Sequence, residues 1–297
     1  MRHFIPAAAV ALLAAAAQTH AAPVVTSNTV FDGFSNGSVN GQGGWAVSNP
    51  AFNQSVVDLG GGNKALRISN TVTSGSFSDQ LFAPRPGGVP ADTVSNPSNG
   101  NAGFFAGESS TGAGYNRFIS SFDFRSVLGT ADPGARITIS PDNGNGGRQG
   151  FVALESTAAG VTVSTFSVDA GGGFVAEPTL ATVAFGQWNT LRYEIDFFDG
   201  ASNDVARIFL NGSLVSTINS WENFYVASQA AIHPLGVPVQ TLLFRLSGSA
   251  ATAAQGFYID NVTIALDNRG AAVSAPATLA LAGLGLLALG ALQRRRA

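Results

Sequence analysis

The chain has 297 residues, enough for one large domain or two small ones, and carries a formal net charge of −3. This charge argues against a nucleic-acid partner, which would need a basic stripe. With no cysteine and three histidines in the whole sequence, a cluster of His or Cys ligands cannot be assembled, which excludes a dedicated zinc site.

Residues 1–21 have the pattern of a secretory signal peptide. Arg2 and His3 form a short basic start, an apolar stretch follows, and residues 19–21 (THA) match a small-x-small cleavage site. The stretch is short for a membrane span and is interrupted by Pro6, which disfavours a permanent anchor. We therefore expect an exported protein that builds a sizeable core without disulfides.

The segment from Val24 to Leu266 consists of short runs rich in β-branched and aromatic residues, separated by Gly, Asn, Ser, Asp and Pro. The runs that predict strands are RITIS, FVALEST, VTVSTFSV, NTLRYEIDFF, VARIFLN, TLLFRLS and GFYIDNVTIAL. No stretch shows a sustained helical period. The pattern predicts an all-β protein in which residues 22–270 form a single jelly-roll β-sandwich, with 84–101 as a surface loop.

One hairpin can be predicted in detail. On both sides of a turn at 199–204, every second residue between 190 and 210 is apolar, as expected for strands with one buried face. Pairing Phe198 with Val205 would keep the two apolar faces together and place Asp196 opposite Arg207.

Three segments carry a resemblance to a known fold. FGQWNTLRYEIDFFDGASNDVARIFLNGSLV resembles the Trp-strand-turn-strand hairpin of concanavalin A-like and laminin-G-like jelly rolls, and GFYIDNVTI resembles a closing strand of such folds. FDGFSNGSVNGQGGW is similar to the opening segment of related bacterial sandwiches. The resemblance implies a concanavalin A-like jelly roll, a fold that hosts lectins, glycanases and inert adhesion modules alike.

The same resemblance bears on metal binding, because it implies that the first and last strands are neighbours. Asp32 and Asp260 would then lie close together, either sharing a structural calcium ion or capping strand ends. The segment SPDNGNGGRQG resembles half of a calcium loop, but Gly144 and Gly146 stand where carboxylates are required, which favours a glycine-rich turn. No other cofactor is expected.

A cluster of carboxylates suggests an enzyme. Glu194, Asp196 and Asp199 are similar to the Glu-x-Asp-x-x-Glu motif of laminarinase-type glycanases, which place one nucleophile and one acid about 5 Å apart. The last position is aspartate in a turn, however, and the cluster lies in the hairpin that follows the catalytic strand of those enzymes. An ion pair between Asp196 and Arg207 is the favoured interpretation.

His233 offers a second route to catalysis, as the base of a jelly-roll polysaccharide lyase. The Tyr and Lys motif of those lyases is absent, and Pro234 indicates a loop. We therefore expect that the protein is not an enzyme, with a secreted glycoside hydrolase or polysaccharide lyase as the alternative.

The aromatic residues suggest where a glycan would bind. Trp188 begins an apolar hairpin and is expected in the core, and Trp45 is expected to anchor the first strand, whereas the polar segment NSWENFY predicts an exposed rim. The predicted glycan-binding residues are Trp221, Glu222, Asn223 and Tyr225. The expected function is weak, non-catalytic binding to extracellular polysaccharide, and a structural surface protein without a ligand is the remaining alternative.

The sequence closes with SAPATLALAGLGLLALGALQRRRA, an apolar run shorter than a typical span, followed by Arg294, Arg295 and Arg296. The segment 274–297, including Pro276, resembles the PEP-CTERM sorting signal of exported bacterial proteins, although SAP replaces Pro-Glu-Pro. The resemblance implies an apolar sorting helix, transient inner-membrane insertion with the arginines in the cytoplasm, processing by an exosortase-type membrane protease, and a final place at the cell surface or outside the cell.

Overall fold

The structure is a computed structural model of the chain. It describes residues 25–49, 51–52, 54–72, 81–87, 115–144, 146–198, 203–228, 239–246 and 250–267. Ala22–Arg269 forms one compact unit. The predicted signal peptide and the predicted sorting segment, with Pro276, Arg294, Arg295 and Arg296, lie outside the described residues. Within the described ranges, no helix is long and apolar enough to cross a membrane.

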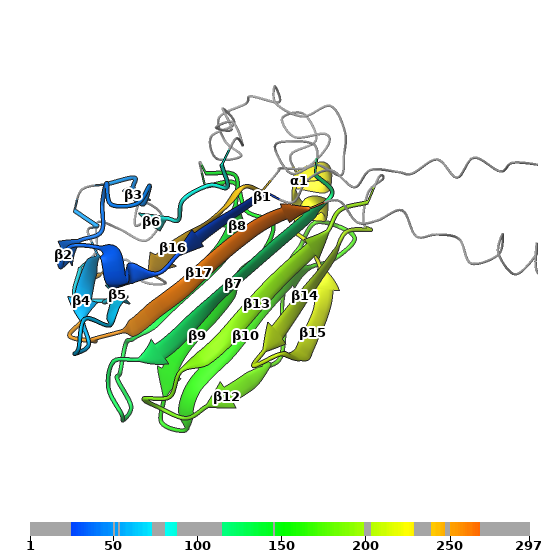
Figure 1. Ribbon diagram of the computed structural model, residues 1–297. Coiled ribbons are helices and arrows are strands. Elements are labelled where there is room, and N and C mark those ends of the chain that lie inside the picture. The colour runs from blue at the N-terminus through cyan, green and yellow to red at the C-terminus, as the bar shows by residue number, and fades with distance from the viewer. Residues whose placement is uncertain are drawn as a thin grey trace, which may run out of the picture. The chain divides into compact units, whose positions relative to one another are not determined.

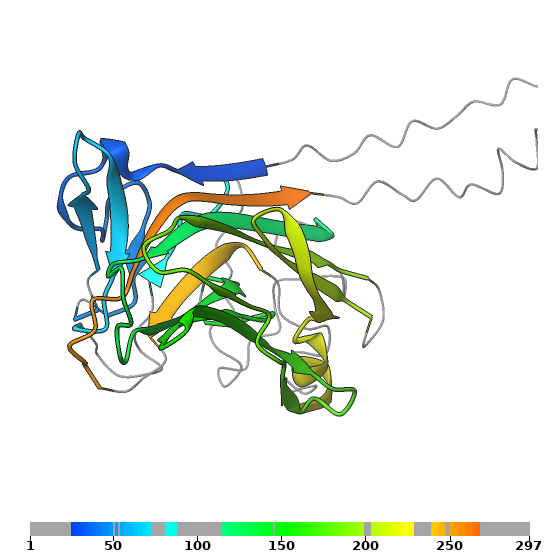
Figure 2. The same cartoon turned by 90° about the horizontal axis from the view of Figure 1, so that it is seen from below.

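The described chain forms two antiparallel sheets, here called sheet A and sheet B, which lie in two layers (Figures 1 and 2). Sheet A contains β1 (Val25–Thr29), β2 (Gly37–Ser38), β4 (Ser55–Asp58), β5 (Lys64–Ile68), β7 (Arg117–Ser126), β13 (Asn189–Asp196), β14 (Val205–Leu210), β15 (Ser213–Asn219) and β17 (Phe257–Asp267). Sheet B contains β3 (Ala46–Val47), β6 (Leu81–Phe82), β8 (Arg136–Asp142), β9 (Val152–Thr157), β10 (Gly160–Val168), β11 (Phe174–Ala176), β12 (Ala181–Val183) and β16 (Thr241–Leu246).

The strand order follows a jelly roll, because neighbours in each sheet are often far apart in sequence. In sheet A the order is β15-β14-β13-β7-β17-β5-β4-β2, with β1 also paired to β17; in sheet B it is β11-β10-β9-β8-β16-β6-β3, with β12 on β10. The all-β sandwich predicted from the sequence is confirmed, and all seven predicted runs form strands. Two short helices, η1 (Phe31–Gly33) and α1 (Glu222–Ser228), complete the described elements.

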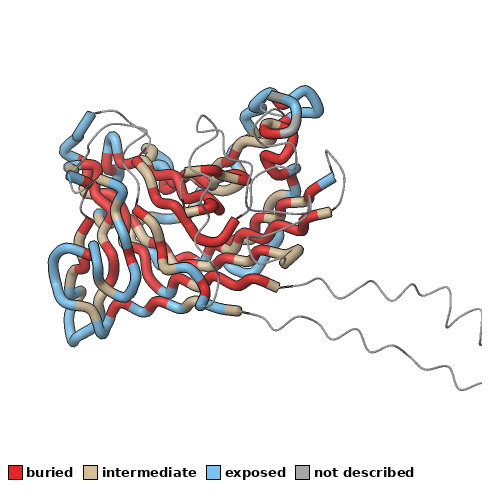
Figure 3. Tube along the Cα trace, turned by 90° about the horizontal axis from the view of Figure 1, so that it is seen from above, coloured by how far each residue is buried: buried red, intermediate tan, exposed pale blue. Residues whose placement is uncertain are grey.

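The core lies between the sheets, where the buried positions of the trace concentrate (Figure 3). Trp45 packs at ring-centroid distances of 5.4 Å from Phe31 and 5.6 Å from Phe244, which joins the N-terminal segment to β16. Tyr193 of β13 reaches across to Gly150, where any Cβ would overlap its hydroxyl oxygen. The close approach of the two layers at this point therefore requires glycine.

The predicted hairpin forms, but its register differs from the expected one by two residues. Asp196 lies opposite Val205, and Glu194 opposite Arg207. The expected ion pair nevertheless exists, because Arg207 reaches diagonally to Asp196 with 2.6 Å between Nη1 and Oδ2. Arg117 on the other neighbouring strand contacts the second oxygen, with 2.7 Å between Nε and Oδ1.

Asp196 therefore joins three strands of sheet A, with its side chain only 5% exposed. Burial alone would raise the pKa of this carboxyl, but the hydrogen bonds and charges of Arg117 and Arg207 outweigh burial, and the pKa lies below its ordinary value of 3.8. The ionised form is thus favoured by folding. Its contribution to stability is complete above the ordinary pKa and is lost as the pH falls through the lowered one.

We expect Asp196→Asn to lower the free energy of unfolding by about 2 kcal/mol at pH 7, because two charged hydrogen bonds are lost. The difference from the wild type should begin to shrink below about pH 4, where the carboxyl of the unfolded chain takes up a proton, and should disappear as the pH falls through the lowered pKa of the folded protein. Urea unfolding at several pH values measures both effects. The control is Glu155→Gln, whose exposed pair with Arg136 should contribute less than about 1 kcal/mol. A constant difference down to pH 2 would contradict the prediction.

Candidate functional site

The outer face of sheet B, formed mainly by β8 and β16, holds a row of polar side chains. Cross-strand partners share a face, and the partners here are Thr241 with Asp142, Leu243 with Ser140, and Arg245 with Thr138. The alternate residues of β16, Leu242, Phe244 and Leu246, belong to the core. We call the outward residues Arg136, Thr138, Ser140, Asp142, Thr241 and Arg245 the sheet B row.

Hydroxyl groups occupy the centre of this row. Ser140 is 1% exposed, yet its Oγ has no hydrogen-bond partner among the described residues. The Thr138 hydroxyl makes only a long bond of 3.5 Å to the carbonyl oxygen of Arg245. A buried hydroxyl normally has a partner, since leaving it without one costs about 1–3 kcal/mol. Ser140 is therefore an unusual buried hydroxyl within the described part of the chain.

Asp142 closes the row at the end of β8 and is fully buried. Its Oδ1 accepts hydrogen bonds from the backbone N–H groups of Gly144 (2.7 Å) and Gly146 (3.0 Å). The segment expected to form a glycine-rich turn does so, because both glycines have positive φ angles of 87° and 92°. The Nε of Arg148 lies 4.0 Å from Oδ2 of the same carboxylate.

Arginines flank the hydroxyls. Arg245 is partly buried within the row, and Arg136 pairs with Glu155 at its end, with 3.1 Å between Nε and Oε2. Arg85 is exposed beside the row, near Gly144, so that a Cβ on Gly144 would lie 3.5 Å from its Nη1. Arginine recognises carboxylates and phosphates with paired N–H donors.

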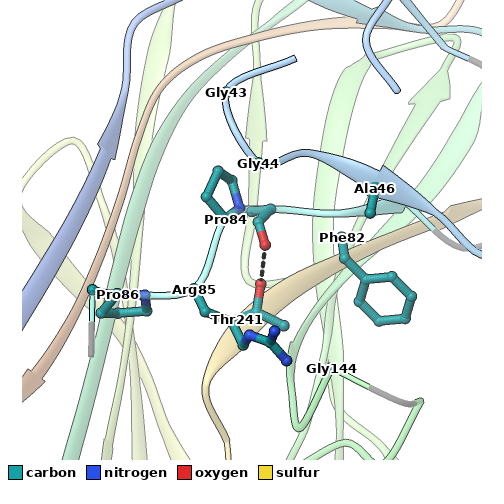
Figure 4. A pocket seen from close by; sticks show the side chains of 11 residues that line it. Gly43, Gly44, Ala46, Phe82, Pro84, Arg85, Pro86, Gly144 and Thr241 are labelled. Atoms are coloured by element: carbon teal, nitrogen blue, oxygen red, sulfur yellow. Dashed lines mark hydrogen bonds between the residues drawn. The ribbon is translucent and has the colours of Figure 1, made fainter. Parts of the chain in front are cut away.

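A pocket of about 610 Å³ continues from the row (Figure 4). Its walls are Gly43, Gly44, Ala46, Phe82, Ala83, Pro84, Arg85, Pro86, Gly87, Gly144 and Thr241. Thr241 belongs to both the pocket and the row, and its hydroxyl donates to the carbonyl oxygen of Ala83 at 2.6 Å. Arg85 is the cation among these residues, and Figure 4 shows its side chain extending toward Thr241 and Gly144.

The predicted exposure of the segment NSWENFY is wrong. Trp221 is 8% exposed and Tyr225 is 2% exposed, and both pack in a small second core with Val168. Glu222 and Asn223 are buried as well. The segment forms the N-terminal part of α1 and the residue before it, so that its aromatic side chains turn inward.

These buried aromatic residues instead hold the loop beside Asp142. The Tyr225 hydroxyl accepts from the backbone N–H of Arg148 and donates to its carbonyl oxygen, both at 2.8 Å. The indole N–H of Trp221 donates to the carbonyl oxygen of Phe166 at 3.1 Å. Burial raises the pKa of Tyr225 far above its ordinary value, although its bond with Arg148 opposes that shift.

Trp45 and Trp188 differ in their exposure to solvent. Trp45, expected to anchor the first strand, is 1% exposed and lies in the core. Trp188 was expected in the core, but it is 38% exposed, because it lies just before β13 on the outer side of sheet A. The guanidinium of Arg125 lies over its ring at 4.9 Å.

The glycanase-like carboxylates do not form a catalytic pair. Asp196 is bound by two arginines, and Glu194 pairs with Arg192, with 2.8 Å between Oε1 and Nη1. Asp199 lies outside the described residues. Both described carboxylates of the glycanase-like motif are therefore engaged in ion pairs.

Asp32 and Asp260 do come together, as expected from the neighbouring first and last strands. With Asp123 they line a pocket of about 430 Å³ on sheet A. Burial, together with the nearby charges of Asp32 and Asp123, raises the pKa of Asp260. Nevertheless, the residues that the structure describes contain no group of three or more His, Cys, Asp and Glu arranged to hold a metal ion. The shared calcium ion stays a prediction.

Similar folds occur in solved carbohydrate-active proteins. A mutant of the alginate lyase Aly36B, in complex with an alginate trisaccharide, aligns with 82% of this chain and 99% of its own at 13% identity, with a TM-score of 0.50. A carbohydrate-binding module, CBM66 from Bacillus subtilis, aligns with 74% and 94% at 13% identity, with a TM-score of 0.35. A sialidase aligns with 81% of this chain at 12% identity and a TM-score of 0.44, but the chain spans only 18% of it. No protein-family model and no curated protein matches the chain.

The match to the alginate lyase overturns the expectation that the protein is not an enzyme. Almost the whole of that lyase aligns with this sandwich, so the same architecture is a complete catalytic domain in another protein. At 13% identity the likeness shows the fold alone. The reaction therefore depends on the side chains of this chain.

Sequence reasoning missed the sheet B row for a specific reason. The alternation of Thr138 and Ser140 with apolar residues is visible in RITIS, and Arg245 is visible in TLLFRLS. Nothing in either run, however, indicates that β8 and β16 are neighbours, since Thr138 and Arg245 are separated by 107 positions. Only the strand order places these polar residues on one surface.

We expect Trp221→Ala to lower the free energy of unfolding by about 3 kcal/mol or more, because a buried ring and its hydrogen bond are lost. Chemical denaturation measures this loss. The matched control is Leu214→Ala on β15, which is 54% exposed and should change stability by less than about 1 kcal/mol. Equal, small effects of both changes would show that Trp221 is not a core residue.

Proposed function

We propose that the protein is a polysaccharide lyase that acts on an anionic, carboxylate-bearing polysaccharide held along the sheet B row. The observation that carries this proposal is the combination of arginines with a buried, unpartnered serine hydroxyl on one sheet face. The fold is shared with an alginate lyase solved with an alginate trisaccharide, which agrees with such a substrate.

The charges of the row suit an anionic chain. Asp142 is fully buried and bonded to backbone N–H groups, while Glu155 is paired with Arg136. Arg245 adds positive charge to the row, and Arg85 adds positive charge to the pocket. A sugar carboxylate would bind these guanidinium groups with paired hydrogen bonds, and sugar hydroxyls would bond with Ser140.

The chemistry follows from the position of the sugar carboxylate. A base removes the proton from the ring carbon that carries the carboxylate, the electron pair forms a double bond to the adjacent carbon, and the glycosidic oxygen leaves that carbon and takes up a proton. Neutralising the carboxylate makes the first proton easier to remove, because it stabilises the charge that develops. We assign this role to Arg245, which lies within the row.

The sheet B row contains no His, Tyr or Lys that could act as the base. We therefore assign the base to a residue outside the row. His233 is the histidine that the sequence contains beyond residue 20, and it precedes β16 in the chain. Its ordinary pKa near 6.5 suits a general base at neutral pH. The structure does not describe residue 233, and its role is proposed from the sequence alone.

The test uses the purified mature protein with polymannuronate, polyguluronate, polyglucuronate and polygalacturonate. We expect new reducing ends and, in equal amount, unsaturated sugars that absorb ultraviolet light. Arg245→Gln should lower kcat/KM at least about tenfold, the effect of losing one stabilising charged contact. His233→Ala should remove activity down to the background rate.

The matched control is Arg192→Gln, which removes an arginine from the other sheet and should leave kcat/KM unchanged. Unfolding curves of all three variants show whether the fold is intact. Reducing ends without unsaturated products would indicate hydrolysis and overturn the proposal. No release from any of the four polymers, or equal losses in Arg245→Gln and Arg192→Gln, would overturn it too.

We also propose that the protein is exported and then sorted at the inner membrane by an exosortase-type protease. The support is the sequence of residues 1–21 and 274–297, including the three terminal arginines. Deleting residues 274–297 should leave the protein folded and exported but released into the periplasm or medium. Cell fractionation measures this change, and identical fractionation of the full and truncated chains would contradict the proposal.

A further inference from the structure

We propose a second carbohydrate site on the outer face of sheet A, where the ring of Trp188 receives one uncharged sugar. It lies on the sheet opposite to the sheet B row and does not depend on the proposed lyase reaction. Its walls are Val30, Asp32, Asn63, Asp123, Trp188, Asp260 and Asn261, around a pocket of about 430 Å³.

Trp188 is the residue that points to a ligand. Among the described residues it is the tryptophan that remains exposed, at 38%, whereas the other two are buried. Large apolar surface of this kind, next to a pocket, is typical of a binding site. The apolar face of a sugar ring stacks on an indole in the same way as other flat groups do.

The ring is held in position before any ligand arrives. The guanidinium of Arg125 lies 4.9 Å from the centroid of Trp188 and 5.1 Å from that of Tyr258. Tyr258 and Arg125 are direct cross-strand neighbours on β17 and β7. This cation–π contact restricts the indole, which lowers the entropy lost when a sugar stacks on it.

Polar side chains that can hydrogen-bond a sugar line the same pocket as the Trp188 ring. Asp123 accepts bonds from the Thr190 hydroxyl (2.5 Å) and the Asn261 amide (2.7 Å), one on each carboxylate oxygen. Each oxygen has a second lone pair, which remains available to a sugar hydroxyl. A β-bulge in β17 begins after Asp260, and Asn261 has a φ of 49°, so the backbone turns here at the edge of the pocket.

The charge of the pocket decides which sugar is accepted. Asp32, Asp123 and Asp260 form no ion pair with any described residue. Three carboxylates repel a uronate, whereas they accept hydrogen bonds from neutral hydroxyls. The two sheet faces thus have opposite preferences, with anionic sugars on sheet B and uncharged sugars on sheet A.

The experiment follows the fluorescence of the mature protein and its quenching by acrylamide. Trp45 and Trp221 are buried, so quenching reports mainly on Trp188. The probes are hexasaccharides of β-1,4-linked glucose, mannose and xylose, with an alginate hexasaccharide as the anionic counterpart. We expect at least one neutral probe to shield Trp188, and the alginate probe to leave its quenching unchanged.

Calorimetric titration of that neutral probe then tests the residues. Trp188→Ala and Asp123→Ala should each weaken binding about tenfold or more. Phe174→Ala is the matched control, because Phe174 is also an exposed aromatic residue, at 48%, but lies on sheet B. It should bind the probe like the wild type, and unfolding curves establish that each variant is folded.

Three results would overturn the second site: no neutral probe shields Trp188, the alginate probe shields it, or Trp188→Ala binds as tightly as the wild type. The lyase assay separates this proposal from the previous one. Trp188→Ala should cleave polyuronates at the wild-type rate, whereas Arg245→Gln should bind the neutral probe normally. Either proposal can therefore fail while the other holds.

Discussion

The packing of two sheets against one shared core is the constraint on which the rest of the structure depends. Every central strand must turn one face inward, so its chemistry is confined to alternate residues on the other face. The layers approach so closely that Tyr193 of β13 reaches the backbone at Gly150 beside β9. Because the inner faces of both sheets are filled with apolar side chains, both candidate sites lie on the outer faces.

The outer faces of the two sheets differ in their charged side chains. On sheet B the carboxylates of the row and its neighbour are buried or paired, and Arg85 and Arg245 carry positive charge beside them. On sheet A, three aspartates surround Trp188, and the nearby cation, Arg125, is stacked on the ring. The net charge of −3 therefore does not describe either face, since the arrangement of charges, and not their sum, determines what each surface attracts.

The aromatic segment around α1 shows how a residue can serve a site without touching a ligand. Trp221 donates to the backbone of β10, and its own backbone N–H bonds to Gln149 at 3.2 Å. Tyr225 binds both backbone groups of Arg148. These bonds position the loop that places Arg148 beside Asp142, so the second small core supports the end of the sheet B row.

The sequence by itself determined the fold class, because alternating apolar residues between turn-forming residues can satisfy only a half-buried sheet. It also determined the apolar face of the hairpin at 190–210. Only the tertiary structure decided which aromatic residues are exposed: Trp188 faces solvent although it begins an apolar hairpin, and Trp221 packs in a second core although it stands in a polar segment. It also decided the sites, since Ser140 and Arg245 meet only through the pairing of β8 with β16. The physical reason is that periodicity within a strand sets which side chains share a face, whereas the neighbours of that strand are set by the packing of the whole chain.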